Sequence, residues 1–174
     1  MAEDAGIFVI LERLSKPLRD LHDTAFKLAH EELRVRTIDS SVYLLAILRV
    51  GDSDPMVKWL HSTGITDKKV AEFIKANFES RRRDKKEKDP WGGTRSTENP
   101  PSYTAAARTM FEKLQWIRVG RPVHSAFVAK LLEAVVVSDS QTVVRIFADV
   151  GIDVADVRRQ MGTYPDANAI GFGL

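Results

Sequence analysis

The chain has 174 residues, of which 44% are hydrophobic and 29% charged, and its formal net charge is +2 at pH 7. These values are typical of a globular protein with one good core, or of two small units that share one. There is no run of about 18 apolar residues, so we expect no membrane span. The acidic start is unlike a secretory signal, and without cysteine there are no disulfides or thiolate sites. We therefore expect a cytoplasmic protein.

The first half of the sequence predicts a series of helices, because apolar residues recur at helical spacing between start and stop signals. The predicted helices cover 7–14, 15–33, about 41–50, a short stretch that starts at Asp54-Pro55 and ends at Gly64, and 66–78. One face of the second carries Leu18, Leu21, His22, Ala25, Leu28, Ala29 and Leu33. We therefore interpret His22 as a partly buried packing residue.

The stretch "TIDSSVYLLAIL", residues 37–48, is a helix start followed by an almost unbroken apolar run. It predicts a helix with no solvent face, which a small protein buries at its centre. A similar stretch, "PVHSAFVAKLLEAV", stands at 122–135. The sequence therefore predicts two central helices.

Residues 79–101 carry no apolar periodicity and are interpreted as a linker. Within them, 81–88 hold six cations and two anions, a local charge of +4 that leaves −2 for the rest of the chain. We interpret this run as a solvated segment, and nucleic acid is not the favoured partner. The alternative is nucleic-acid binding, with Trp91 stacking on a base beside the cations Arg81, Arg82, Arg83, Lys85 and Lys86.

The second half repeats the helical order of the first, and an irregular tail follows at 162–174. Ser102 or Thr104 starts a helix, Ser125 starts the buried run, Asp139 or Ser140 starts a short helix that Gly151 ends, and a last helix runs to Met161. Phe26 matches Phe111 at a spacing of 85 residues, and Gly64 matches Gly151 at a spacing of 87. The sequence therefore predicts an internal repeat of about four helices, packed around a pseudo-twofold axis.

A doubled four-helix unit, with a serine-capped apolar helix and then a short helix ending in Gly-Ile, resembles the Clp N-terminal domain. This is the double-repeat module at the front of Clp/Hsp100 AAA+ unfoldases, and the resemblance covers about residues 14–161. It implies one all-α domain: an N-terminal helical extension (1–14), a first repeat (15–78), the charged linker (79–101) and a second repeat (102–161).

The starts of the two buried helices depart from the family pattern. Better-known branches have Thr-Glu-His there, whereas this chain has Ser40-Ser41-Val42 and Ser125-Ala126-Phe127. The capping hydroxyl is retained and the glutamate is absent. Because acidic residues at these positions help some family members bind the guanidinium of phosphoarginine, we expect no phosphoarginine site.

The N-terminal stretch "GIFVILERLSKPL" and the turn "GDSDP" are more similar to the N-domain of ClpV, the unfoldase that dismantles type VI secretion sheaths. In that branch an extra N-terminal helix and the first repeat helix form a groove for a helix of the sheath protein. The resemblance, together with five consecutive apolar residues at 7–11, implies a protein-binding groove. Its candidate anchors are Ile7, Phe8, Leu11, Leu14 and Leu18.

Signals for catalysis are weak. In "HEELR", Arg34 takes the place of the second histidine of the zinc motif H-E-x-x-H, so we expect no metal and interpret His30 and Glu31 as a surface pair. The sequence contains no Walker A loop, so we expect no ATPase motor within these residues. Whether the sequence continues into an unfoldase stays open. We therefore expect no enzyme and no cofactor.

The expected function is that of a module that binds a protein substrate or adaptor segment in an apolar groove and is linked to an AAA+ unfoldase. A second interpretation is a free-standing regulator, or decoy, that occupies the sites of a full-length Clp N-domain. The sequence does not separate the two.

Overall fold

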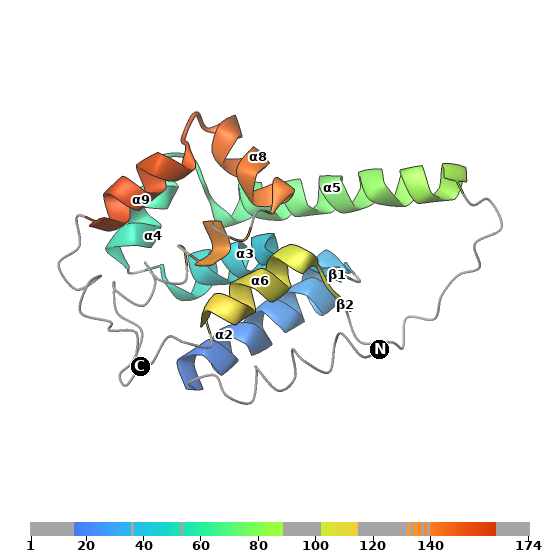
Figure 1. Ribbon diagram of the computed structural model, residues 1–174, viewed down its shortest axis with the longest axis horizontal. Helices are drawn as coiled ribbons and strands as arrows, with labels where there is room; N and C mark the ends of the chain where they lie inside the picture. The colour runs from blue at the N-terminus through green and yellow to red at the C-terminus, as the bar shows by residue number, and fades with distance from the viewer. Residues whose placement is uncertain are drawn as a thin grey trace.

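The structure, a computed structural model, describes residues 16–35, 37–52, 54–88, 102–114, 132, 134–136, 138 and 140–162. Over these residues the chain is mostly helical, which confirms the predicted all-α class (Figure 1). No described helix is both long and apolar enough to span a membrane. The elements are α2 (Lys16–Lys27), the π-helix η1 (Leu28–Leu33), β1 (Thr37–Ile38), α3 (Ser40–Val50), α4 (Pro55–Ser62), α5 (Asp67–Lys88), β2 (Ser102–Tyr103), α6 (Ala105–Leu114), α8 (Gln141–Asp149) and α9 (Val154–Gly162).

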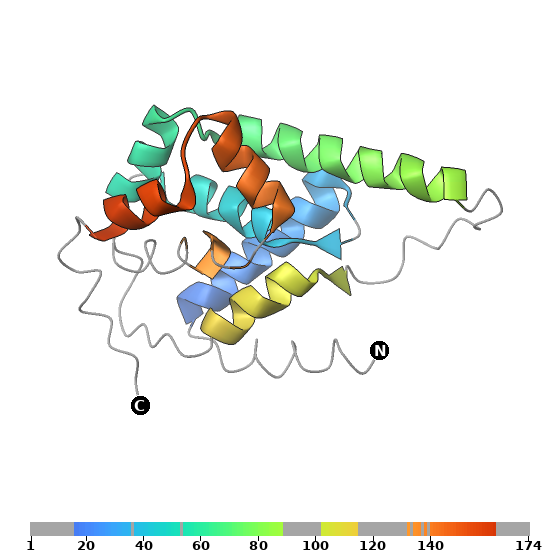
Figure 2. The same cartoon turned by 45° about the horizontal axis from the view of Figure 1, so that its top comes forward.

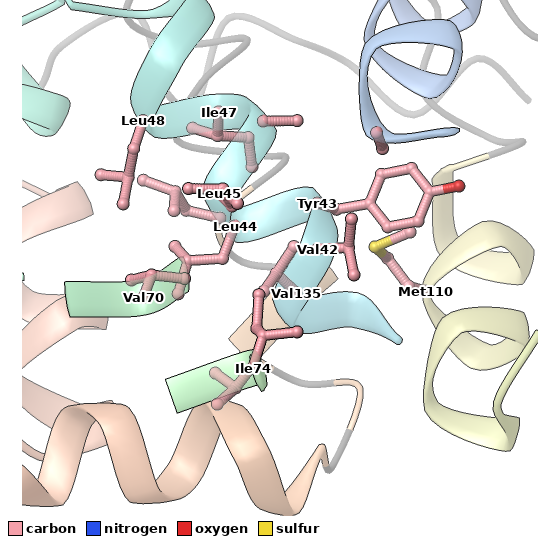
Figure 3. Packing of buried hydrophobic residues seen from close by; sticks show 14 of the residues in the cluster. Val42, Tyr43, Leu44, Leu45, Ile47, Leu48, Val70, Ile74, Met110 and Val135 are labelled. Atoms are coloured by element: carbon pink, nitrogen blue, oxygen red, sulfur yellow. The ribbon is translucent and has the colours of Figure 1, made fainter. Parts of the chain in front are cut away.

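Helix α3 lies at the centre and has no solvent face over most of its length. Every residue from Ser40 to Leu48 is buried, as the apolar run predicts. Side chains leave the helix in several directions, and Val70 of α5 and Met110 of α6 lie among those that they meet (Figure 3). Fully burying a leucine or isoleucine side chain contributes about 1.5–3 kcal/mol. Helix α3 therefore supplies a continuous stretch of the hydrophobic core, from Val42 to Leu48.

Two short strands bring the starts of α3 and α6 together. β1 and β2 pair in parallel, with Thr37 opposite Ser102 and Ile38 opposite Tyr103. The amide of Thr104 extends the pairing by donating to the Ile38 carbonyl oxygen at 3.0 Å. Helices α2 and α6 lie side by side below α3 in both views (Figures 1 and 2), so β2 and α6 lie against the first half of the chain.

The turns that follow α4 and α8 share four backbone hydrogen bonds. Both use a glycine with positive φ, +93° at Gly64 and +70° at Gly151, as the sequence predicts for helix-ending glycines. Four backbone hydrogen bonds of the first turn recur 87 residues later. Written donor first, the pairs are Thr63–Leu60 and Val150–Phe147, Gly64–His61 and Gly151–Ala148, Ile65–Leu60 and Ile152–Phe147, and Val70–Thr66 and Val157–Asp153.

Helix α5 corrects the predicted linker. The sequence ends this helix at 78, but the structure continues it to Lys88, and its second half extends beyond the other helices in both views (Figures 1 and 2). The missed signal is charge pairing: oppositely charged residues stand four positions apart at Glu79 and Arg83, and again at Asp84 and Lys88. Such pairs stabilise a solvated helix without apolar periodicity. Residues 89–101 lie outside the described residues.

The end of the first long helix also differs from the prediction. The last turns, η1, are a π-helix, and Arg34 closes them with a φ of 53° while its amide donates to the carbonyl oxygen of Ala29. The left-handed conformation is uncommon for arginine. The core face is nevertheless kept, because Leu28, Ala29 and Leu33 are all buried.

Candidate functional site

The candidate groove residues fall into two groups. Ile7, Phe8, Leu11 and Leu14 lie outside the described residues. Leu18 is only 2% exposed and belongs to the hydrophobic core, together with Leu21 and Ala25 of the same helix face. Leu18 is therefore a core residue and not an exposed anchor.

The basic residues of the alternative site lie on one element. Arg81, Arg82, Arg83, Lys85 and Lys86 all belong to the second half of α5, the part that extends beyond the body (Figure 1). Trp91 lies outside the described residues. The predicted cations thus belong to a helix and not to a linker.

The carboxylate of Asp39 is a polar centre at which three helices begin. Asp39 is the N-cap of α3, and its Oδ2 accepts from the amide of Ser41 at 3.2 Å and from the Ser41 hydroxyl at 2.8 Å. Thr104 donates to Oδ1 at 2.9 Å, and Ser140 donates to Oδ2 at 2.5 Å. Thr104 and Ser140 also accept from backbone amides in the first turns of α6 and α8. One carboxylate therefore joins the N-terminal starts of α3, α6 and α8.

This arrangement corrects the predicted cap of α3. The family resemblance points to a serine hydroxyl as the cap, whereas here the cap is Asp39. Ser40 instead accepts a hydrogen bond of 2.7 Å from the Ser138 hydroxyl, and both serines are buried. Carboxylate oxygens only accept hydrogen bonds when ionised, and those of Asp39 already accept four. The centre is therefore occupied by structural contacts.

A second polar contact lies between α2 and β2. Nε2 of His22 is 2.8 Å from the Tyr103 hydroxyl, and Nδ1 is 3.5 Å from a carboxylate oxygen of Asp23. The rings of Tyr43 and Phe111 surround this pair, with centroids 6.3 Å and 6.0 Å from the His22 ring. Burial lowers the pKa of His22, and the Asp23 carboxylate opposes that effect in part. His22 is the partly buried packing residue that the sequence predicts.

Tyr43 is the most enclosed titratable group near this cluster. Burial raises its pKa well above the usual value, and Tyr103 and Asp23 add to the effect. Its ring meets Phe111 edge-on at a centroid distance of 5.2 Å. Among the described residues its hydroxyl has no hydrogen-bond partner. A neutral phenol in an apolar enclosure contributes packing and holds α3 against α6.

The zinc-like sequence forms a helix surface. His30 and Glu31 are exposed, and His30 stacks on Phe26 at a centroid distance of 6.3 Å. Arg34, in the place of a second histidine, closes the helix. In the described part of the chain, no three His, Asp or Glu side chains gather as a metal site would require.

No protein-family model and no curated protein matches this chain. Sequence reasoning missed the Asp39 centre, although it identified Thr104 and Ser140 as possible helix starts. The missing information was spatial, because residues 39, 104 and 140 meet only after the helices pack.

Proposed function

We propose that the chain is a Clp N-domain-like module, built from two related four-helix units, that binds a segment of another protein without catalysis. The observation that carries the proposal is a turn that recurs after 87 residues with four equivalent backbone hydrogen bonds. An accidental likeness between two helix ends would not extend through the glycine into the first turn of the next helix. The recurrence supports a duplicated unit.

Contacts between the two units support the pseudo-twofold arrangement. The equivalent turns lie next to each other, because a Cβ built on Gly64 would lie 3.5 Å from Cγ1 of Val150. The pairing of β1 with β2 links the segment before α6 to the segment before α3. Elements close to a twofold axis meet their own equivalents in this way. The described elements α2, α3, α4 and α5 would form the first unit, and α6, α8 and α9 belong to the second.

The polar groups at the centre support a scaffold role. The Asp39 carboxylate accepts four hydrogen bonds from its own fold, and Ser40 accepts one from Ser138. These groups hold helix starts in place. Recognition of a helix in a groove requires a rigid scaffold and apolar anchors, and no reactive side chain. The proposed anchors are Ile7, Phe8, Leu11 and Leu14, which the resemblance to the ClpV branch places beside the first repeat helix.

The test is site-specific photo-crosslinking of the full chain in extract from its host. A benzophenone amino acid replaces Phe8 in one variant and Arg145, an exposed residue of α8, in the matched control. We expect a discrete protein adduct from position 8 and none from position 145. Excess unlabelled chain should compete for the adduct, and excess chain carrying Phe8→Ser and Leu11→Ser should not. Equal labelling from both positions, or equal competition by both chains, would refute the groove.

The identity of the captured protein separates the two forms of the proposal. A substrate or adaptor, such as a sheath-like helix, fits a recognition domain that works for an unfoldase. An AAA+ unfoldase captured through the same anchors fits the free-standing regulator. A competition experiment with a full-length Clp N-domain then shows whether both proteins use one site.

A further inference from the structure

The side chain of His22 connects helix α2 of the first half of the chain to strand β2 of the second. Its Nε2 lies 2.8 Å from the Tyr103 hydroxyl, and the two residues are 81 positions apart. Tyr103 stands opposite Ile38 in the β1–β2 pair, and the next residue, Thr104, donates to the carbonyl oxygen of Ile38 at 3.0 Å. The His22–Tyr103 contact therefore lies at the junction where the start of α6 meets the first half of the chain.

The neighbours of the ring assign its hydrogen. The carboxylate of Asp23 lies 3.5 Å from Nδ1 of His22, and an ionised carboxylate only accepts hydrogen bonds. We therefore assign the hydrogen of the neutral ring to Nδ1, so that Nε2 accepts from the Tyr103 hydroxyl. A second proton would enter at Nε2, and the hydroxyl would have to turn from donor to acceptor. Protonation of the ring thus acts directly on the contact that joins α2 to β2.

The packing around the ring disfavours its charged form. Four aromatic rings surround it at centroid distances of 6.0–6.3 Å, and 13% of the His22 side chain is exposed. The four rings are those of Phe26 of α2, Tyr43 of α3, Tyr103 of β2 and Phe111 of α6. Burial lowers the pKa of His22, and Asp23 opposes that effect in part. Because the Asp23 side chain is 73% exposed, water screens its charge, and a protonated ring gains hydration by moving outward.

Titratable or charged groups stand near His22 on each element that packs against it. Tyr43 is a neutral phenol at physiological pH, because burial raises its pKa. His30 of η1 is exposed and stacks on Phe26 at 6.3 Å, so it needs its own control. The remaining groups are Arg19 and Asp23 of α2, Tyr103 of β2, and Arg108, Glu112 and Lys113 of α6. Histidine is the residue type whose ordinary pKa places its change of charge between about pH 5 and about pH 8.

We propose that His22 is a pH-sensitive latch: when its ring gains a proton, β2 and the start of α6 separate locally from α2, while the core around α3 stays folded. The buried run Ser40–Leu48 of α3 has Tyr43 as its one titratable side chain, and this phenol already carries its proton. Acid therefore acts on the α2–β2 side of the core and not on its centre. The latch goes beyond the proposed protein-binding function, and neither depends on the other.

The test is native-state hydrogen exchange of the full chain, followed by NMR, with the amide of Thr104 as the reporter. We expect its exchange, relative to the intrinsic rate at each pH, to rise at least about fivefold between about pH 8 and about pH 5. At the acid end, its opening free energy should depend on urea with less than about half of the slope for global unfolding. An unchanged rate would mean that the ring does not control the junction, and a full slope would mean that only global unfolding exposes the amide. Either result would overturn the proposal.

Two histidine variants assign the effect to one ring. His22→Gln keeps a polar side chain beside Tyr103 and takes up no proton, so the relative exchange of the Thr104 amide should stay constant with pH to within about twofold. The matched control, His30→Gln, replaces the exposed histidine that stacks on Phe26 and should behave as the wild type does. If the pH dependence persists in His22→Gln, or disappears in His30→Gln, another group is responsible and the latch is refuted.

Tyr103→Phe tests the contact without changing the histidine. It keeps the aromatic packing and removes the hydroxyl that donates to Nε2. Because that hydrogen bond favours the neutral ring, its loss should raise the pKa of His22, measured from the chemical shifts of the imidazole. This measurement also decides the matter if His22→Gln does not fold. A His22 pKa that stays the same or falls would show that Nε2 is not the acceptor, and the latch would be wrong.

Discussion

Thr104 donates a hydrogen bond of 2.9 Å to Oδ1 of Asp39, so the residue that starts α6 is attached directly to the residue that caps α3. These residues are 65 positions apart. Ser140, the cap of α8, donates to the other oxygen of the same carboxylate. Three helix starts from both halves of the chain thus depend on one side chain.

We expect Asp39→Ala to lower the free energy of unfolding by about 2.5–4 kcal/mol. Loss of an N-cap costs about 1 kcal/mol, and loss of hydrogen bonds to a charged acceptor costs about 1.5–3 kcal/mol more. Urea unfolding followed by circular dichroism measures the change, with an unchanged m-value as evidence that the compactness of the two states is unaltered.

Asp39→Asn is the matched control for that substitution. Asparagine caps helices well and keeps one acceptor oxygen, so we expect a loss of about 1 kcal/mol. A double-mutant cycle with Ser140→Ala should give a coupling energy of at least about 0.5 kcal/mol. If Asp39→Ala lowers the free energy of unfolding by less than about 0.5 kcal/mol, the starts of the three helices are held by packing alone.

The burial of His22 predicts an acid-dependent loss of stability. Its folded-state pKa is lowered, so at pH values below 6.5, the ordinary pKa of histidine, the unfolded chain takes up a proton before the folded chain does. The stabilising contribution is complete above that pH and is lost as the pH falls toward the folded pKa. We expect the free energy of unfolding to fall over this window in the wild type.

His22→Gln removes this titration while keeping a polar side chain beside Tyr103. The difference in unfolding free energy between wild type and variant should therefore change with pH below 6.5. The comparison cancels the contribution of Glu32, whose pKa Arg49 lowers in both proteins. A pH-independent difference would show that the His22 environment does not disfavour the charged ring.

The positive φ angles of Gly64 and Gly151 predict that replacing either glycine by alanine lowers the stability by a similar amount. Gly64→Ala and Gly151→Ala should each destabilise the fold by about 1–2 kcal/mol, because an L-residue at positive φ is strained. A Cβ would meet only an ordinary contact at Gly64 and nothing within 4 Å at Gly151, so the cost is conformational.

Asparagine distinguishes conformational strain from a steric clash at these turns. Because Asn adopts the left-handed region more readily, Gly151→Asn should cost less than half of Gly151→Ala. Thermal unfolding followed by circular dichroism provides the comparison. If Gly151→Ala and Gly151→Asn lower the stability equally, backbone strain at positive φ is not the cause of the loss.

Local signals in the sequence predicted the helices that begin and end with clear punctuation. Asp54 caps α4 through the amide of Met56, Thr66 accepts from Lys69, and Gly64 and Gly151 take positive φ, all as expected. The absence of a solvent face on α3 was equally predictable, because a helix with an unbroken apolar run is stable in a small protein only when all its sides are buried. These features depend on neighbours within one or two turns.

Features that depend on distant neighbours, or on charge without apolar periodicity, were missed. The sequence places Asp39 before a helix but does not show that Thr104 and Ser140 converge on it. The charged half of α5 was taken for a linker because helix prediction relied on an apolar stripe. Leu18 was assigned to a groove, although it shares the core face with Leu21.

We expect no preference for phosphoarginine over arginine in a calorimetric titration. Ser41 and Ala126 offer no anion at the two helix starts that the sequence predicts, and the Asp39 carboxylate beside Ser41 already accepts four hydrogen bonds. Binding a guanidinium there would require breaking contacts that hold three helices. A selective affinity for phosphoarginine would show that other carboxylates form the site.

The last prediction compares the groove with the cationic helix as the source of protein-partner affinity. Phe8→Ser with Leu11→Ser should weaken binding of the captured partner at least tenfold with little loss of fold. Terminal segments usually contribute less stability than central ones, while a few apolar anchors supply most of a binding energy. Neutralising Arg81, Arg82, Arg83, Lys85 and Lys86 should leave this affinity nearly unchanged, because ion pairs in water add little to a mostly apolar contact.

Calorimetry at low and moderate salt measures both variants, with circular dichroism as the folding control. If the charge variant loses the protein partner while the Phe8/Leu11 variant keeps it, the groove hypothesis fails and the electrostatic one replaces it. If the Phe8/Leu11 variant unfolds, the N-terminal segment is part of the core, and single substitutions at Phe8 or Leu11 that preserve the fold then decide the matter. Partner affinity that survives in such a folded single variant would place the binding surface elsewhere on the molecule.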